Sequence, residues 1–156
     1  MCVCLWVAEL TVAEELIPLR ENAVNLGWNL KELDGLRFLL AMPAKDKSLF
    51  YLLVDCDNYK VQPPAWHWSD PSGTYTNRAV DQPKGSGFLH PSGVICAPWN
   101  RLAYNTIDSR GPHKDWPIGD WLQNSATAGC TTLAHMALRI FVELNGPRFA
   151  NARLGT

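Results

Sequence analysis

The sequence predicts one α+β domain spanning residues 1–156, built from an N-terminal helix, a four-stranded antiparallel meander, an irregular segment and a C-terminal helix packed across the sheet. Apolar residues recur at helical spacing near both ends, and the short apolar runs between them are separated by turn residues. At 156 residues with 47% hydrophobic content, the chain can build one sizeable core but has no room for a second domain.

The first helix is expected from about residue 11 to residue 26. Thr11 and Glu14 have the spacing of a capping box, and Gly27 is a stop signal. The apolar residues at helical intervals between them are Leu16, Leu19, Ala23 and Leu26. Pro18 conflicts with this helix, because a proline beyond the first turn removes a hydrogen bond and costs about 3 kcal/mol. We therefore expect a kink at Pro18 or a helix that begins near it.

Three apolar runs, 28–33, 36–42 and 48–56, are separated by hairpin-turn signals and predict the meander. In the third run apolar residues occupy both faces, so it is expected to be a central strand covered on both sides, with Cys56 as an inert core residue. Residues 65–68 predict a short fourth strand.

The second half of the chain is expected to contain two surface loops and one helix. Residues 73–87 and 100–112 are polar and without periodicity, and the second loop is expected to cover the candidate site and to move. Thr131 or Thr132 can cap a last helix, and 145–147 (Asn-Gly-Pro) ends it. Its apolar stripe is Leu133, Met136, Ala137, Ile140 and Leu144. Only a short tail follows.

Cys96 is the candidate functional centre. It follows a turn at 90–93 (His-Pro-Ser-Gly), because Pro91 fixes its φ angle and Gly93 permits a positive one. Pro98 prevents a regular strand after it. The thiol is therefore expected where a short buried segment emerges at the surface, which suits a nucleophile.

Composition excludes several classes of function. A net charge of −1 and a pI of about 6.4 leave no basic surface for nucleic acid. The apolar start of the chain is shorter than a signal-peptide core and lacks a basic flank, so we expect no membrane attachment. Five cysteines at irregular spacings suit a reducing cytoplasm better than a disulfide scaffold.

Several short motifs occur in an order that resembles the ubiquitin-conjugating enzymes. They are Tyr59, the prolines at 63–64, the aromatic strand 66–68, His90 with Pro91, Ile95 with Cys96, Trp116 with Pro117, and the final helix. The chain resembles a minimal, divergent bacterial member. It departs from the family pattern in three ways: Ser92 replaces the asparagine of the His-Pro-Asn turn, the intervals around the cysteine differ, and no two further C-terminal helices follow.

The resemblance implies that Cys96 accepts the C-terminus of a ubiquitin-like modifier as a thioester and passes it to an amine, usually a lysine of a target protein. It also implies an upstream activating enzyme and no cofactor, and bacterial relatives often act in antiviral defence. In the family His90 would shape the turn by hydrogen bonding to backbone. The role of the missing asparagine, which helps to stabilise an oxyanion, would fall to Ser92, Asn100 or Asn105, unless both asparagines are ordinary loop residues.

Three other hypotheses remain open. In a Cys-His hydrolase, His113 would be the base for Cys96 and Asp115 would orient it, with the thiol at a helix start. A zinc site could use His67, His90, Cys96 and His113, although no pair has a short ligand spacing. A non-catalytic scaffold of the same fold would only bind a ubiquitin-like protein.

Overall fold

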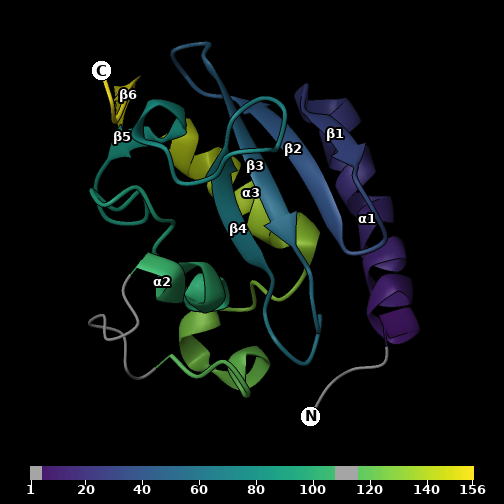
Figure 1. The fold of residues 1–156 in the computed structure, drawn as a ribbon. Helices are drawn as coiled ribbons and strands as arrows, with labels where there is room; N and C mark the ends of the chain where they lie inside the picture. The colour runs from purple at the N-terminus through teal and green to yellow at the C-terminus, as the bar shows by residue number, and fades with distance from the viewer. Residues whose placement is uncertain (1–4, 108–115) are drawn as a thin grey trace.

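A computed structural model of the chain describes residues 5–107 and 116–156, and its architecture is α+β, as predicted (Figure 1). The helix α1 (Leu5–Leu26) precedes a four-stranded antiparallel sheet in the order β1-β2-β3-β4. The strands are β1 (Asn29–Glu32), β2 (Arg37–Pro43), β3 (Leu49–Asp55) and β4 (Ala65–Ser69). The helix α3 (Leu133–Leu144) crosses one face of this sheet. In the part of the chain that the structure describes, no helix is long and apolar enough to cross a membrane.

The segments between β4 and α3 are more ordered than the sequence suggests. They contain short 3₁₀ turns, the strand β5 (Pro83–Gly85) and the helix α2 (Arg101–Ile107). The 3₁₀ turns are Ala79–Asp81, Pro98–Asn100, Trp121–Gln123 and Ser125–Thr127. The last strand, β6 (Phe149–Arg153), pairs with β5 in a second, two-stranded sheet.

Two loop predictions are therefore wrong. The range 73–87 contains β5, and the tail after α3 contains its partner β6, which buries Phe149 in the main core. A strand of three residues is too short to show periodicity, and its pairing is decided by a segment far along the chain. The predicted loop 100–112 begins with buried helix: Ala103 and Tyr104 of α2 are 0% and 4% exposed.

The helix α1 begins earlier than predicted and continues through Pro18. Thr11 lies inside it and donates its hydroxyl to the carbonyl of Val7 at 2.9 Å, so it does not cap the helix. The alternative in which the helix begins near Pro18 is also wrong. Leu16 and Leu19 are buried on either side of the proline, and each such side chain contributes about 1.5–3 kcal/mol, which offsets the lost hydrogen bond.

The core lies between one face of the sheet and the helices α1 and α3. From β2 and β3 it contains Phe38, Leu40, Met42, Phe50, Leu52 and Val54. The third strand is central in the sheet, as predicted, but it is not covered on both faces, since Leu49 is 45% exposed. Cys56 is fully buried, as expected for a core residue.

Glu15 of α1 joins the two helices. One carboxylate oxygen accepts hydrogen bonds from the backbone N–H of Leu133 at 2.9 Å and from the hydroxyl of Tyr59 at 2.7 Å. The other oxygen pairs with the ammonium of Lys60 at 3.0 Å. A carboxylate at the N-terminus of α3 is favourable for the helix dipole, and the Thr132 hydroxyl caps the same end, as predicted, by accepting from His135 N–H.

Candidate functional site

The segment before Cys96 forms a small hairpin around the predicted turn. His90 N–H donates to Val94 at 3.2 Å, Gly93 N–H donates to the carbonyl of His90 at 2.8 Å, and Cys96 N–H donates to Phe88 at 2.9 Å. Gly93 has φ = +92°, and a Cβ there would lie 2.2 Å from the side chain of Gln82. Cys96 therefore begins the chain segment that leaves a rigid turn.

His90 and Ser92 stabilise this turn. The ring Nδ1 of His90 accepts the backbone N–H of Ser92 at 3.1 Å and lies 2.8 Å from the Ser92 hydroxyl. The ring thus bonds to backbone, as the resemblance implied. The ring also forms a T-shaped pair with Tyr104 of α2, with ring centroids 6.5 Å apart. Neither His90 nor Ser92 lines the pocket that contains Cys96.

Asn100 anchors the chain beyond Cys96. Its side chain is fully buried and accepts the N–H of Trp66 at 2.8 Å. Its amide donates to the carbonyls of Trp66 at 3.2 Å and Ile95 at 3.1 Å. Both donors of the amide are thus used by backbone, so Asn100 positions Cys96 against β4 and has no donor left for an oxyanion.

Asn105 lies on α2 and is half-buried. Its side-chain oxygen is buried and has no hydrogen-bond partner in the ranges 5–107 and 116–156, and the residue does not line the Cys96 pocket. The remaining two candidates, His113 and Asp115, lie outside the described residues, as does the end of the predicted loop 100–112.

Cys96 lines a pocket of about 450 Å³ whose walls come from several chain segments. The residues around the thiol are mostly apolar or small: Phe88, Ala97, Pro98, Trp99, Trp116, Ala126, Thr127, Ala128 and Cys130. Arg139 of α3 completes the lining and is its only charged member among the residues that the structure describes. The pocket is therefore a largely apolar hollow with one cation at its wall.

The thiol of Cys96 is half-buried, and burial raises its pKa above the ordinary value. The same effect, reduced by the nearby Arg139, raises the pKa of Cys130 to about 11. Both thiols are therefore protonated at neutral pH. A nucleophilic role for Cys96 requires that its proton leave as the new bond to sulfur forms.

Arg139 is held in place by packing and by charge. Its guanidinium lies 4.9 Å from the centroid of the Phe88 ring and pairs with Glu143 at 2.9 Å. Glu143 is 5% exposed and also pairs with Arg148, which does not line the pocket. The buried carboxylate thus pairs with one arginine that lines the Cys96 pocket and with a second that does not.

The structure bears on two of the alternatives. The residues that directly follow Cys96 form a single 3₁₀ turn, Pro98–Asn100, and α2 begins only at Arg101, so a helix starts near Cys96 but not at it. The raised pKa of Cys96 is nevertheless the opposite of the activation that a hydrolase thiol needs. Among residues 5–107 and 116–156, no three potential metal ligands lie together, and the ring of His67 bonds to Asn77.

Sequence reasoning missed Arg139 and Cys130 as lining residues of the Cys96 pocket. Arg139 interrupts no pattern, because it lies on α3 beside the apolar stripe, where an exposed charge is ordinary. Its contact with the Phe88 ring, which is distant in sequence, brings it to the wall of the Cys96 pocket. Comparisons of the chain with protein-family models, curated proteins and solved structures found no match.

Proposed function

We propose that this chain is a conjugating enzyme for a ubiquitin-like protein, which carries the modifier's C-terminus as a thioester on Cys96 and passes it to a lysine amine of a target. The observation that carries the proposal is the placement of Cys96, half-buried in a pocket of about 450 Å³ and shortly after a rigid turn. The α+β element order, with a helix before the sheet and another across it, also supports it.

Two exchanges at sulfur make up the reaction. In loading, the Cys96 sulfur attacks the thioester carbonyl of the modifier on its activating enzyme; a C–S bond to Cys96 forms, the C–S bond to the donor breaks, and the thiol proton passes to the donor sulfur. In transfer, a lysine amine attacks the Cys96 thioester; a C–N bond forms, the C–S bond breaks, and an amine proton restores the thiol. Neither exchange consumes an oxidant or a reductant.

The pocket suits these steps in two respects. Small side chains at Ala97, Ala126 and Ala128 leave room for an extended peptide tail beside the thiol. Arg139 lines the same pocket, and the proposal assigns to its N–H donors and positive charge the stabilisation of the oxyanion, the task that the family asparagine shares. The proposal places the reaction in the cytoplasm, since a thiol carrier needs a reducing compartment, and bacterial antiviral defence is its proposed context.

The test is formation of a covalent adduct from this protein, the modifier, its activating enzyme and ATP, with candidates for both partners taken from neighbouring reading frames. A thioester on Cys96 gives an adduct that dithiothreitol cleaves and that Cys96→Ala abolishes. Cys130→Ala is the matched control, because this thiol lines the same pocket, and Cys56→Ala controls for the buried core thiol.

Other results identify the alternatives. An acyl-enzyme that forms from a conjugate without ATP and is discharged by water indicates a hydrolase. Binding of the modifier without any Cys96-dependent adduct, in the presence of a working activating enzyme, overturns the proposal and favours a scaffold.

A further inference from the structure

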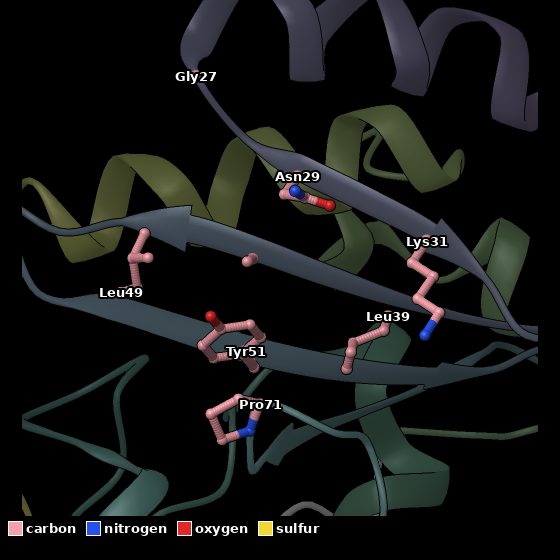
Figure 2. A pocket seen from close by; sticks show the side chains of 8 residues that line it. Gly27, Asn29, Lys31, Leu39, Leu49, Tyr51 and Pro71 are labelled. Carbon is pink, nitrogen blue, oxygen red and sulfur yellow. The ribbon is translucent and has the colours of Figure 1, made fainter.

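A second pocket lies on the face of the sheet that α3 does not cover. In Figure 2 its side chains project from β1, β2 and β3 and from the turn at Pro71. Its volume is about 330 Å³, at the lower end of the range of about 300–1,000 Å³ that ligand pockets have. It shares no lining residue with the Cys96 pocket.

The strand register explains why this face is hollow. Asn29 is paired with Ala41, and Ala41 with Tyr51, so a methyl group lies between two larger side chains. In the neighbouring rows, Lys31 is paired with Leu39, and Leu49 with Pro43. The result is an apolar floor at Ala41 with walls of Leu39 and Leu49.

The turn at 70–75 closes one side of the pocket. Asp70 accepts hydrogen bonds from the Ser72 hydroxyl at 2.6 Å and from the N–H of Tyr75 at 2.9 Å. A Cβ on Gly73 would lie 3.5 Å from Leu39, so the turn packs down on the sheet. The Ser72 hydroxyl and the backbone of Tyr75 lower the pKa of Asp70 to about 2, so the carboxylate that holds the turn is charged at neutral pH.

Three polar groups that line the pocket have no partner among the described residues. The ammonium of Lys31 forms no ion pair, and no hydrogen bond engages the amide of Asn29 or the hydroxyl of Tyr51, among the residues described. All three line the pocket together with the apolar floor. A cation and two neutral hydrogen-bonding groups above an apolar surface are complementary to a flat molecule that carries a carboxylate.

We propose that this pocket binds a small aromatic carboxylate. The carboxylate pairs with Lys31 and accepts from Asn29, while the ring lies on Ala41 between Leu49 and Tyr51. This site is independent of the chemistry proposed for Cys96, so failure of either proposal leaves the other unaffected.

The experiment is a titration of the full chain with 2-naphthoate, in which calorimetry measures the affinity and backbone amide NMR locates the site. Neutral 2-naphthamide is the control ligand. Naphthoate is expected to bind at least tenfold more tightly than the amide and to shift amides of 29–31, 39–41 and 49–51. Lys31→Gln should reduce naphthoate affinity at least tenfold, whereas Lys84→Gln, an exposed lysine on β5, should leave it unchanged.

Ala41→Leu places a larger side chain on the pocket floor and should abolish binding. If this variant does not fold, Lys31→Gln still tests the proposal, because Lys31 is exposed. No binding at millimolar naphthoate, equal affinity for the amide, or unchanged affinity in Lys31→Gln would each overturn the proposal.

Discussion

The side chain of Asn100 replaces a missing strand neighbour for Trp66. It accepts the N–H of Trp66 at 2.8 Å and donates to the carbonyl of the same residue at 3.2 Å, as a paired residue of an adjacent strand would. Its third hydrogen bond, to the carbonyl of Ile95, ties the residue before Cys96 to the edge of the sheet at β4. The position of the thiol thus depends on one buried amide.

Asn100→Ala should therefore lower the free energy of unfolding by about 2–4 kcal/mol, because it leaves buried backbone groups of Trp66 and Ile95 without partners. Urea unfolding measures the loss, and the rate of Cys96 alkylation should rise in the same variant. Asn25→Ala, on the exposed surface of α1, is the control and should change neither quantity. A loss of unfolding free energy below about 0.5 kcal/mol, as is usual for surface substitutions, would contradict this role of Asn100.

Alanine substitutions at three glycines distinguish the cost of backbone strain from the cost of a steric clash. Gly93→Ala combines a positive φ with a contact of 2.2 Å to Gln82, whereas Gly129 has a positive φ and open space, and Gly119 has open space alone. Thermal unfolding should show Gly119→Ala close to neutral and Gly129→Ala losing about 1–2 kcal/mol. Gly93→Ala should lose more than Gly129→Ala; equal losses for the two would show that Gln82 moves aside freely.

Arg139→Gln should slow thioester loading of Cys96 by roughly 10–100-fold, if its donors meet the oxyanion of the intermediate. Arg148→Gln is the matched control, since it removes a second partner of Glu143 from outside the pocket. Arg139→Lys keeps the charge and should retain part of the rate. Equal rates for Arg139→Gln and Arg148→Gln would assign Arg139 a structural role.

Alkaline pH should destabilise the protein through its buried thiols. Burial, together with Asp55 and Glu15, raises the pKa of Cys56 in the folded state, so above the ordinary thiol pKa of about 8.5 the unfolded chain loses a proton that the folded chain keeps. Stability therefore falls as pH rises beyond that value, by at most about 1.4 kcal/mol per pH unit for this group. Urea unfolding of Cys56→Ala between pH 8 and 10 should show a shallower fall; an unchanged slope would exclude Cys56 as a cause.

Turn residues, helix caps and apolar periodicity predicted those strands and helices whose ends are determined by neighbouring residues in the sequence. The strands of the meander end at turn residues such as Asp34 and Gly35, and α3 has a capping threonine and an apolar stripe. Thr11 misled for a physical reason: α1 buries Ala8 as well as Val12, so the helix extends back past a residue that elsewhere would cap it.

The remaining features depend on partners that are distant in sequence. From the sequence Asn100 is a polar loop residue, and only the fold places its side chain against Trp66 and Ile95. The strand β5 forms because Phe149 and Arg153, far along the chain, pair with it. The turn made Cys96 a candidate, and it stays a prediction. The pocket that it lines includes residues of α3 and of the 3₁₀ turns, whose arrangement no motif encodes.

The bond between Glu15 and Leu133 also has a consequence for synthesis. The two residues are 118 positions apart. At a translation rate of about 5–20 residues per second, Leu133 is therefore synthesised roughly 6–24 s after Glu15. Until then Leu16 and Leu19 of α1, and the face of the sheet that α3 will cover, have no complete set of neighbours. The nascent chain is therefore exposed to aggregation or chaperone binding until Leu133 has been synthesised, and the packing of α1 against α3 forms only after that point.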